Sequence, residues 1–374
     1  MQKPKYLTRI NQIVELDAAE RDELAPVEEK FVFRSNDYYQ GLINWADPHD
    51  PIRQIIVPNK AELEEWGELD ASDEGGYTIL PGLQHKYRDT ALLLVNDVCG
   101  AYCRFCFRKR LFMDDNDETV RDITRGLEYI RTHPEITNVL LTGGDPLVMS
   151  TPRLAEMVGR IREIPHVKII RIGSKMPAFS PARILGDPAL AEMISKYSTG
   201  DGQIYIMAHF NHPRELTPEA VEGMLALQRA GATTVNQTPL IRGINDSPEV
   251  LAELFNRLSF IGVAPYYVFQ CRPTLGNKTY SVPLEEAYTI FLGAHGLCSG
   301  LAKRARFVMS HRSGKVEVVG LTGEQIFMRY HQAALAADAG RIFALERKPD
   351  AHWLDDYFTT EDTPAPAPSV AYAS

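Results

Sequence analysis

Three of the five cysteines in the chain lie close together, at Cys99, Cys103 and Cys106, in the spacing C-x3-C-x2-C. A structural zinc site normally takes four Cys or His ligands, so three thiolates do not complete one. They could hold three corners of a [4Fe–4S] cluster and leave one iron open for a small molecule, although such clusters usually have four cysteine ligands. Inert buried cysteines are the weaker alternative, because cytosolic proteins rarely concentrate thiols on one loop without a redox or metal role.

The elements that must position this loop are short apolar runs that alternate with amphipathic helical segments. The expected strands are 91–95, 138–142, 167–173, 204–208, 233–238, 265–270 and 306–310. The expected helices are 120–132, 152–164, 188–197, 217–230 and 248–261. This alternation predicts parallel strands with right-handed crossovers, in an α/β fold built as a full or partial (β/α)6-type barrel. Chemistry in barrels lies at the carboxyl ends of the strands, which places the cysteine loop at the active mouth.

The rest of the chain divides into regions by composition and pattern. Residues 1–80 are polar with helical patterns and predict a helical N-terminal extension to the barrel, which would occupy residues 81–320. Residues 321–360 are expected to form a short C-terminal helical extension. Residues 361–374 are rich in proline and alanine, which predicts a disordered tail.

Overall composition limits the classes of function. The 374 residues carry a formal net charge of −9, which disfavours a nucleic-acid partner. No apolar run approaches the length of a membrane span, and the N-terminal residues lack the apolar region of a secretion signal. The sequence therefore predicts a cytoplasmic protein with no nucleic-acid and no membrane partner. Cys271 and Cys298 are isolated and need not pair.

Two further groups of residues end the second and third expected strands. Gly143, Gly144 and Asp145 follow the second strand, where two glycines would let the backbone approach a ligand closely or simply form a turn. Arg171 and Ser174 come at the end of the third strand. They could contact a ribose or a carboxylate, or they could belong to an ordinary strand-ending turn.

Polar residues also end the fourth and fifth expected strands. His209, Asn211 and His212 follow the fourth, and Gln237 lies at the end of the fifth. Two histidines and an asparagine at a barrel mouth are hard to explain as packing. A metal site is the weaker explanation, because no carboxylate–histidine pair on a helix accompanies them. Gln237 could hydrogen-bond a cofactor.

Two cationic residues follow the last expected strands. Arg272 comes after the sixth strand, where a guanidinium would suit a carboxylate or a phosphate. Lys315 could form a Schiff base, provided that its amine is desolvated or close to other cations. The alternative is a β-turn at 312–315 that joins two antiparallel strands, and the residues alone leave both interpretations open.

Taken in order, these motifs resemble the lysine 2,3-aminomutase family of radical SAM enzymes, and the resemblance runs from about Asp47 to Gly320. It includes Asp50-Pro51-Ile52-Arg53, Pro81-Gly82-Leu83 with His85 and Tyr87, Tyr102-Cys103-Arg104 with Cys106, Gly143-Gly144-Asp145, Arg171-Ile172-Gly173, 209–215, 242–246 and 265–267. The resemblance implies that the predicted barrel is a radical SAM barrel.

The resemblance also implies a chemistry. The three cysteines would hold a [4Fe–4S] cluster whose open iron binds S-adenosylmethionine, and a reductant such as flavodoxin or ferredoxin would supply the electron that cleaves it. The glycine motif at 143–144 would contact the methionine amino group. The resulting radical abstracts hydrogen from an amino acid, whose amino group moves from C2 to C3 while pyridoxal phosphate holds it. Arg108 would bind the substrate carboxylate, and Lys315 would carry the pyridoxal phosphate. The family tends to associate, which implies a homo-oligomer.

This chain departs from the family pattern at three places. Lysine-specific members use two aspartates for the substrate ammonium, whereas this chain has Arg272 at one position and no aspartate near Ser310. A cation there would repel lysine, so we expect a 2,3-aminomutase for an acidic or neutral amino acid. The loop before Lys315 is shorter than the family's glycine run, and Thr90 stands where a basic residue is expected near the phosphate. These two changes leave open a radical SAM enzyme that works without pyridoxal phosphate on the same barrel.

Overall fold

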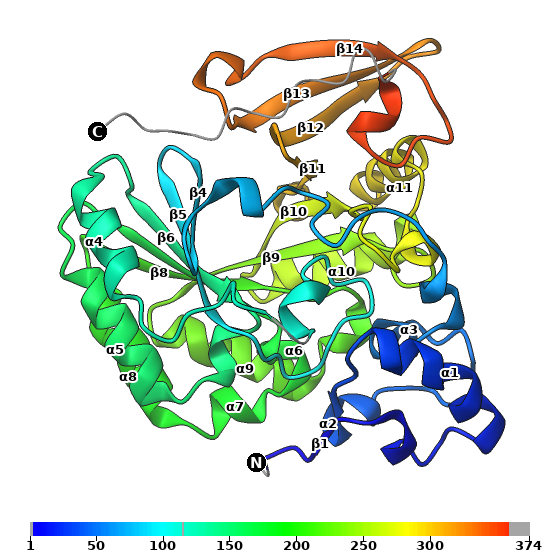
Figure 1. Ribbon diagram of the computed structural model, residues 1–374, viewed down its shortest axis with the longest axis horizontal. Coiled ribbons are helices and arrows are strands. Elements are labelled where there is room, and N and C mark those ends of the chain that lie inside the picture. The colour runs from blue at the N-terminus through cyan, green and yellow to red at the C-terminus, as the bar shows by residue number, and fades with distance from the viewer. Residues whose placement is uncertain (1–2, 114–115, 359–374) are drawn as a thin grey trace.

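The computed structural model describes residues 3–113 and 116–358. One large sheet runs through this part of the chain, with its strands in the order β14-β13-β12-β11-β10-β9-β8-β7-β6-β5-β4-β3 (Figure 1). Neighbouring strands from β5 to β11 are parallel, and the pairs outside this set are antiparallel. The outermost strands, β3 and β14, do not pair with each other in the described chain. The sheet is therefore open, which confirms the predicted partial barrel.

The parallel strands coincide with the predicted apolar runs. They are β5 (Thr90–Asn96), β6 (Asn138–Gly143), β7 (Ile169–Ser174), β8 (Gln203–Ala208), β9 (Thr233–Leu240), β10 (Ala264–Gln270) and β11 (Arg306–His311). Strand β11 pairs in parallel with β10, so the parallel set extends one strand beyond a six-stranded barrel.

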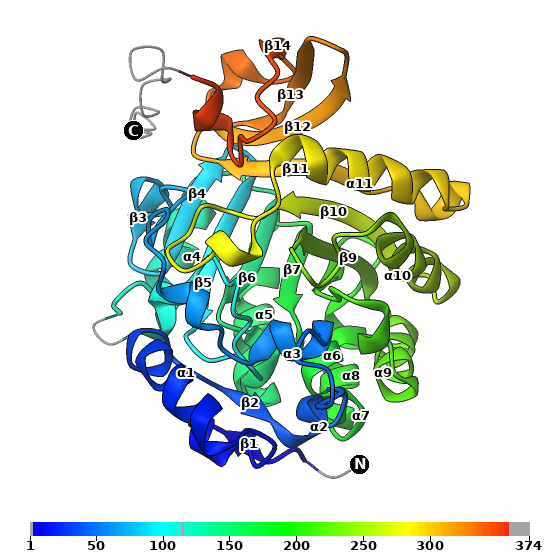
Figure 2. The same ribbon diagram turned by 90° about the vertical axis from the view of Figure 1, so that its right-hand side faces the viewer.

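Helices between the strands cover the outer face of the parallel sheet (Figures 1 and 2). The longer ones are α4 (Thr124–Thr132), α5 (Thr151–Arg162), α8 (Pro188–Tyr197), α9 (Pro218–Arg229), α10 (Pro248–Phe260) and α11 (Leu284–Gly296). Side-chain caps fix where some of them begin, since Thr217 accepts a hydrogen bond from the Ala220 amide and Ser247 from the Val250 amide. The sequence predicted the first five of these helices but not α11. Two short helices, α6 (Met176–Phe179) and α7 (Ala182–Leu185), precede α8.

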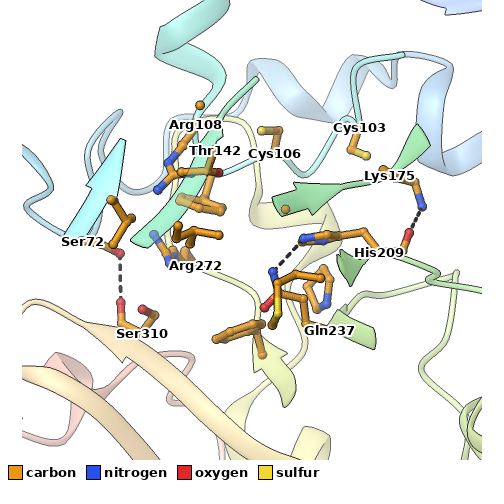
Figure 3. Close-up of a pocket in the computed structure, with 18 of the residues that line it drawn as sticks. Ser72, Cys103, Cys106, Arg108, Thr142, Lys175, His209, Gln237, Arg272 and Ser310 are labelled. Atoms are coloured by element: carbon orange, nitrogen blue, oxygen red, sulfur yellow. Dashed lines mark hydrogen bonds between the residues drawn. The ribbon is translucent and has the colours of Figure 1, made fainter. Parts of the chain in front are cut away.

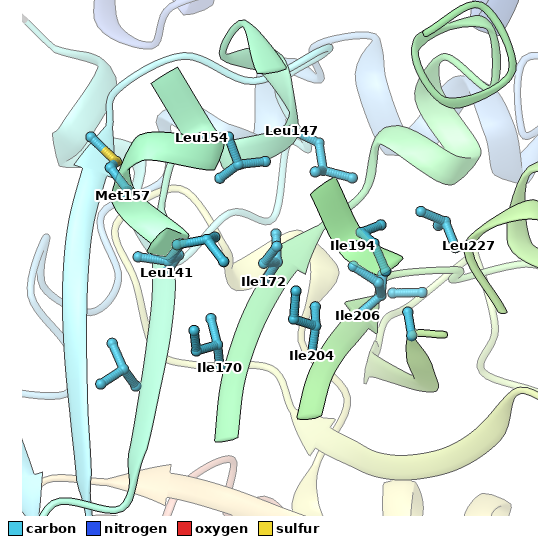
Figure 4. Close-up of a cluster of buried hydrophobic side chains, with 14 of the residues drawn as sticks. Leu141, Leu147, Leu154, Met157, Ile170, Ile172, Ile194, Ile204, Ile206 and Leu227 are labelled. Atoms are coloured by element: carbon cyan, nitrogen blue, oxygen red, sulfur yellow. The ribbon is translucent and has the colours of Figure 1, made fainter. Parts of the chain in front are cut away.

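The alternation of side chains along each parallel strand separates the core from the active mouth. Ile170 and Ile172 of β7 and Leu141 of β6 are buried against the surrounding helices, in the apolar cluster of Figure 4. The residues between them, such as Leu140 and Arg171, line a cavity on the other face. Successive side chains of a strand point to opposite faces. The strands that form the core therefore also carry the candidate site.

The N-terminal region holds short helical segments and one small sheet that was not predicted. Its elements are β1 (Tyr6–Leu7), α1 (Ala18–Lys30), β2 (Ser35–Asn36), α2 (Asp37–Gln40), α3 (Pro51–Ile56) and the 3-10 turn η2 (Lys60–Leu63). Strands β1 and β2 pair antiparallel with each other and stand apart from the large sheet. The predicted boundary at residue 80 separates two paired strands, because β3 (Thr78–Leu80) pairs with β4 (Leu83–Tyr87) in that sheet.

The predicted C-terminal helical extension at 321–360 is wrong. The region consists mainly of antiparallel strands that continue the sheet, namely β12 (Gly314–Leu321), β13 (Gln325–Ala333) and β14 (Ile342–Glu346). The burial of side chains along β13 has the period of two that is typical of a strand, because Ile326, Met328 and Tyr330 are buried and their neighbours are not. The strands lie at the opposite end of the molecule from the N-terminal extension (Figures 1 and 2). The predicted tail at 361–374 lies outside the described residues.

Among residues 3–113 and 116–358, no helix has both the length and the apolar character that a membrane crossing requires.

Candidate active site

A cavity of about 320 Å³ opens at the carboxyl ends of the parallel strands. Its lining falls into two groups, and Figure 3 shows Lys175 and His209 at one end and Ser72 and Arg272 at the other. The cysteine end comprises Cys99, Cys103, Cys106, Gly143, Gly144, Asp145, Ser174, Lys175, His209, Asn211 and Gln237. The cationic end comprises Glu74, Lys86, Arg108, Arg171, Arg272 and Lys315 with several tyrosines. The cavity therefore brings together residues that are far apart in sequence.

The cysteine loop has little regular structure, and the N-terminal extension holds it. The Arg34 Nε atom donates to the carbonyl of Cys99 at 2.8 Å, and the amide of Tyr102 donates to the carbonyl of Arg34 at 3.0 Å. Arg104, between the cysteines, forms a buried ion pair with Glu62 at 2.7 Å. The extension thus positions the loop that carries the three clustered cysteines, a role that the sequence did not reveal.

All three clustered cysteines line the cavity as free thiols. Burial raises the pKa of each of them, for Cys103 to about 12, so a bound cation is needed to stabilise the thiolates. No group of three or more His, Cys, Asp or Glu side chains in the described chain is arranged for a single metal ion. A cluster has a different requirement, because each of its irons takes its own thiolate and the sulfurs need not converge on one point.

Close backbone packing explains the two glycines at the end of β6. Gly143 has φ +113, and a side chain there would clash with the carbonyl of Asn96. A Cβ atom at Gly144 would lie 2.6 Å from the Val98 amide nitrogen. Both residues also line the cavity. The absence of side chains at Gly143 and Gly144 therefore lets the start of the cysteine loop pack against the end of β6. This packing is independent of any ligand that the two residues contact.

Asp145 and Ser174 bind each other at the cysteine end. The Ser174 hydroxyl donates to the Asp145 carboxylate at 3.0 Å, and so do the amides of Leu147, Lys175 and Met176 at 2.9, 2.7 and 3.1 Å. Burial raises the pKa of Asp145 to about 6, although these hydrogen bonds oppose the shift. Asp145 therefore fastens the loop after β7 to the loop after β6.

His209 and Gln237 form a hydrogen-bonded pair in the cavity, with 2.7 Å between His209 Nε2 and the Gln237 amide nitrogen. Burial, together with the charges of Lys175 and Arg108, lowers the pKa of His209 to about 3, so the imidazole is neutral and accepts. Lys175, which the sequence reading missed, donates to Asn211 Oδ1 at 2.6 Å and to Glu215 Oε1 at 2.5 Å. The signal in the sequence that could have identified Lys175 was its position directly after Ser174, at the end of a strand.

His212 lies elsewhere, contrary to its prediction as a cofactor contact. His212 is not among the described residues that line the cavity. Its Nδ1 atom accepts the amide of Arg214 at 3.1 Å and so caps the 3-10 turn η6 (Pro213–Glu215).

Arg108 is fully engaged at the cationic end. Its Nε and Nη2 atoms donate to the carboxylate of Glu74 at 3.0 and 2.7 Å, and its Nη1 atom donates to the Thr142 hydroxyl at 2.8 Å. Glu74 also accepts from Arg110 at 2.7 Å. Burial would raise the pKa of Glu74, but the guanidinium groups of Arg108 and Arg110 outweigh it and hold that pKa far below its usual value. Glu74 lies in a loop before the barrel, so no strand-end rule pointed to it.

Arg272 lies beside this ion pair. Its guanidinium carbon is 3.6 Å from the centre of the Phe107 ring, and the guanidinium donates no hydrogen bond within the described chain. Burial and the charge of Arg108 lower the pKa of Arg272 to about 10, while Glu74 opposes the shift. Arg272 therefore offers a stacked, unpaired cation to the cavity.

Lys315 lies in a hairpin and also reaches the cavity. Residues 311 and 314 pair across the turn between β11 and β12, and Lys315 pairs with Ser310, so the predicted β-turn is present. The Lys315 Nζ atom lies 4.3 Å from the centre of the Tyr267 ring and 3.3 Å from Gln332 Oε1. Burial, followed by the charges of Arg171, Lys86 and Arg272, lowers the pKa of Lys315 to about 7.

Arg171 and Lys86 complete the cationic end. Arg171 is the third residue of β7 rather than its end, and its Nε atom is buried without a hydrogen-bond partner. Lys86 donates to the carbonyl of His311 at 2.5 Å, and burial lowers its pKa to about 7. The sequence reading missed Lys86, although Gln84 and Lys86 alternate along β4 and both line the cavity.

Known proteins of similar sequence identify the family of this chain. Residues 93–255 match the family model of the Radical SAM superfamily. A protein of Aquifex aeolicus (strain VF5) named "Putative L-lysine 2,3-aminomutase" is 56% identical over 356 residues, which cover 95% of each chain. The L-lysine 2,3-aminomutase of Clostridium subterminale is 39% identical over 70% of this chain and 62% of its own. The glutamate 2,3-aminomutase of Clostridioides difficile (strain 630) is 33% identical over 82% of this chain and 71% of its own. This chain therefore belongs to the lysine 2,3-aminomutase family of radical SAM enzymes.

Proposed function

We propose that the protein is a 2,3-aminomutase for a free α-amino acid with an acidic or neutral side chain. The observation that carries this proposal is the unpaired guanidinium of Arg272. Among the described residues of the cavity wall, the carboxylates are Glu74 and Asp145, and both already accept several hydrogen bonds. A substrate ammonium would find no free carboxylate there. A substrate carboxylate could form charge-assisted hydrogen bonds with Arg272.

The names of the relatives leave both a basic and an acidic substrate open, because they include lysine and glutamate 2,3-aminomutases. A lysine side chain would bring its ammonium toward Arg272, and like charges repel most strongly where water is excluded. Arg108, on the same side of the cavity, would hold the α-carboxylate.

The cysteine end fits a [4Fe–4S] cluster and S-adenosylmethionine, which the superfamily implies. Cys99, Cys103 and Cys106 would hold the cluster, and together the two groups supply the radical that abstracts hydrogen from the substrate. Gly143 and Gly144 line the cavity at this end. Asn211, Gln237 and the neutral ring of His209 add polar atoms at the same end. A reductant such as flavodoxin or ferredoxin would supply the electron.

The cationic end fits pyridoxal phosphate. Lys315 would hold it through an amine that is neutral in a large fraction near pH 7, as a nucleophile must be. Arg171 and Lys86 would supply cations for its phosphate, although Thr90 provides none. When bound, pyridoxal phosphate stabilises the radical through which the amino group moves.

One observation favours a second candidate, an enzyme that works without pyridoxal phosphate. Lys315 sits in a tight hairpin and pairs with Ser310, so β-sheet pairing alone accounts for its place in the fold. Borohydride reduction of the protein incubated with pyridoxal phosphate separates the two. A reduced adduct on Lys315, found by peptide mass analysis, supports the first candidate, and its absence supports the second.

The main proposal is tested with a panel of amino acids. The protein, purified without oxygen and with its cluster reconstituted, is incubated with S-adenosylmethionine, a reductant and glutamate, aspartate, glutamine, alanine or lysine. We expect a β-amino isomer, resolved by chromatography and mass spectrometry, from an acidic or neutral member. Conversion of lysine alone would contradict the proposal.

A further inference from the structure

A segment before the barrel, residues 68–77, crosses the cationic end of the cavity, and we call it the strap. The Glu68 amide donates to the carbonyl of Pro273 at 3.0 Å. The Ser72 hydroxyl donates to the carbonyl of Ser310 at 3.0 Å, a contact drawn in Figure 3. The Tyr77 hydroxyl donates to the carbonyl of Arg312 at 2.5 Å. The strap therefore spans from the end of β10 to the hairpin that carries Lys315.

The strap carries a carboxylate into the cavity. The side chains of Glu74 and Arg108 are 11% and 9% exposed, and the two carboxylate oxygens of Glu74 meet the Nε and Nη2 edge of Arg108. Arg110 donates to the same carboxylate. The remaining nitrogen of Arg108, Nη1, donates a hydrogen bond to the Thr142 hydroxyl. All three guanidinium nitrogens of Arg108 thus have partners within the protein.

This arrangement conflicts with free access of a substrate to Arg108. A substrate carboxylate binds a guanidinium best through two parallel hydrogen bonds, and Glu74 occupies the edge that would make them. Buried guanidinium groups need a counter-charge, so removal of Glu74 without replacement would be costly. The exchange of one carboxylate for another keeps the charge of the cavity unchanged.

We propose that Glu74 is an internal competitor of the substrate, which holds Arg108 until a substrate carboxylate displaces it and the strap. This inference rests on the proposed function in assigning Arg108 to the substrate. Glu74 then restricts Arg108 to ligands that carry a carboxylate, because a ligand without one cannot replace its charge. The backbone around it suits such a movement, since Gly75 and Gly76 follow Glu74 directly and Gly67, with φ +73, precedes the strap.

The test uses glutarate, which has two carboxylates and no amino group, as the probe. The full-length protein with its reconstituted cluster is titrated by calorimetry, as wild type and as Glu74→Gln. Loss of the competing charge should tighten glutarate binding roughly tenfold or more, because the charge-assisted hydrogen bonds between Glu74 and Arg108 then no longer oppose the ligand. The matched control is Glu68→Gln, an exposed carboxylate of the same strap, which should leave the affinity unchanged.

Hydrogen exchange of the strap gives a measurement that does not depend on the variant's folding. Glutarate should increase exchange at residues 68–77 of the wild type, whereas a ligand that binds beside a fixed Glu74 would decrease it or leave it unchanged. Decreased or unchanged exchange overturns the inference, and so does a Glu74→Gln variant that binds glutarate no more tightly than the wild type.

A further variant separates this failure from failure of the proposed function. If Arg108→Gln binds glutarate as tightly as the wild type, Arg108 is not a carboxylate anchor, and both the proposed role of Arg108 and the inference are wrong. The same holds if neither the wild type nor Glu74→Gln binds glutarate. If Arg108→Gln loses binding and Glu74→Gln loses it equally, Arg108 keeps its role and Glu74 only positions it.

Discussion

The two ends of the cavity satisfy their polar groups in different ways. At the cysteine end, side chains bind one another, as in the pairs Asp145–Ser174 and His209–Gln237. At the cationic end, Arg171 and Arg272 have no hydrogen-bonded partner in the described chain. Buried polar groups are normally paired, so unpaired cations indicate a place where ligands complete the structure. This contrast supports the proposal that the cationic end selects the substrate.

The largest effect is expected from removing one cluster ligand. Cys103→Ala should abolish cleavage of S-adenosylmethionine, because two thiolates cannot replace three at the cluster. Iron content, the visible spectrum and 5′-deoxyadenosine formation measure the result. The control is Cys298→Ala, whose thiol is buried in a separate core and should be dispensable. Full cleavage by Cys103→Ala would remove the cluster from the cysteine end.

The next effect concerns selection at the cationic end. Arg272→Asp should lower turnover of an acidic substrate about 100-fold, since loss of one partner of a buried charge pair costs about 2–5 kcal/mol. Cleavage of S-adenosylmethionine without substrate should change little, because Arg272 lies at the other end of the cavity (Figure 3). Unchanged selectivity over the amino-acid panel would exclude Arg272 from the substrate site.

The two ends also differ in how far the sequence predicted them. Residues at strand ends, such as Gly143, His209 and Gln237, were found because parallel strands bring their carboxyl ends together. Glu74 and Lys86 were missed because they come from a loop and an antiparallel strand outside the strand–helix repeat. Their places depend on contacts across the fold, such as Glu74 with Arg108, which local patterns do not encode.

The prediction of strands from the sequence was limited in the same way. The parallel strands were predicted because short apolar runs alternate regularly with helical segments along the chain. Strand β13 has a mixed face, where Phe327, Arg329 and His331 alternate with the buried Ile326, Met328 and Tyr330, and the region was predicted to be helical. Its state is fixed by pairing with β12 and β14, which lie on either side of it in the sheet.

A smaller effect is expected from the charges around Lys315. With a pKa of about 7, its neutral fraction should rise from about one tenth at pH 6 to about nine tenths at pH 8. The rate of adduct formation with pyridoxal phosphate, measured by absorbance and borohydride trapping, should rise over this range. Removal of a nearby cation favours the protonated amine, so Arg171→Gln should move the midpoint upward by about one pH unit. Arg341→Gln, on an exposed turn, should leave it unchanged. A midpoint near that of an ordinary lysine would contradict the clustering of cations.

The smallest effect tests whether His212 belongs to the cysteine end of the cavity. His209 and His212 are three residues apart, yet only His209 lines the cavity. His212→Ala should cost about 1 kcal/mol through loss of a cap and should leave the affinity for S-adenosylmethionine unchanged. His209→Ala, its matched partner, should weaken that affinity roughly tenfold, because it leaves Gln237 without its acceptor. Urea unfolding and calorimetry with the reconstituted protein measure the two quantities. Equal losses of affinity would mean that the turn at Pro213 opens when S-adenosylmethionine binds, and that the cysteine end includes both histidines.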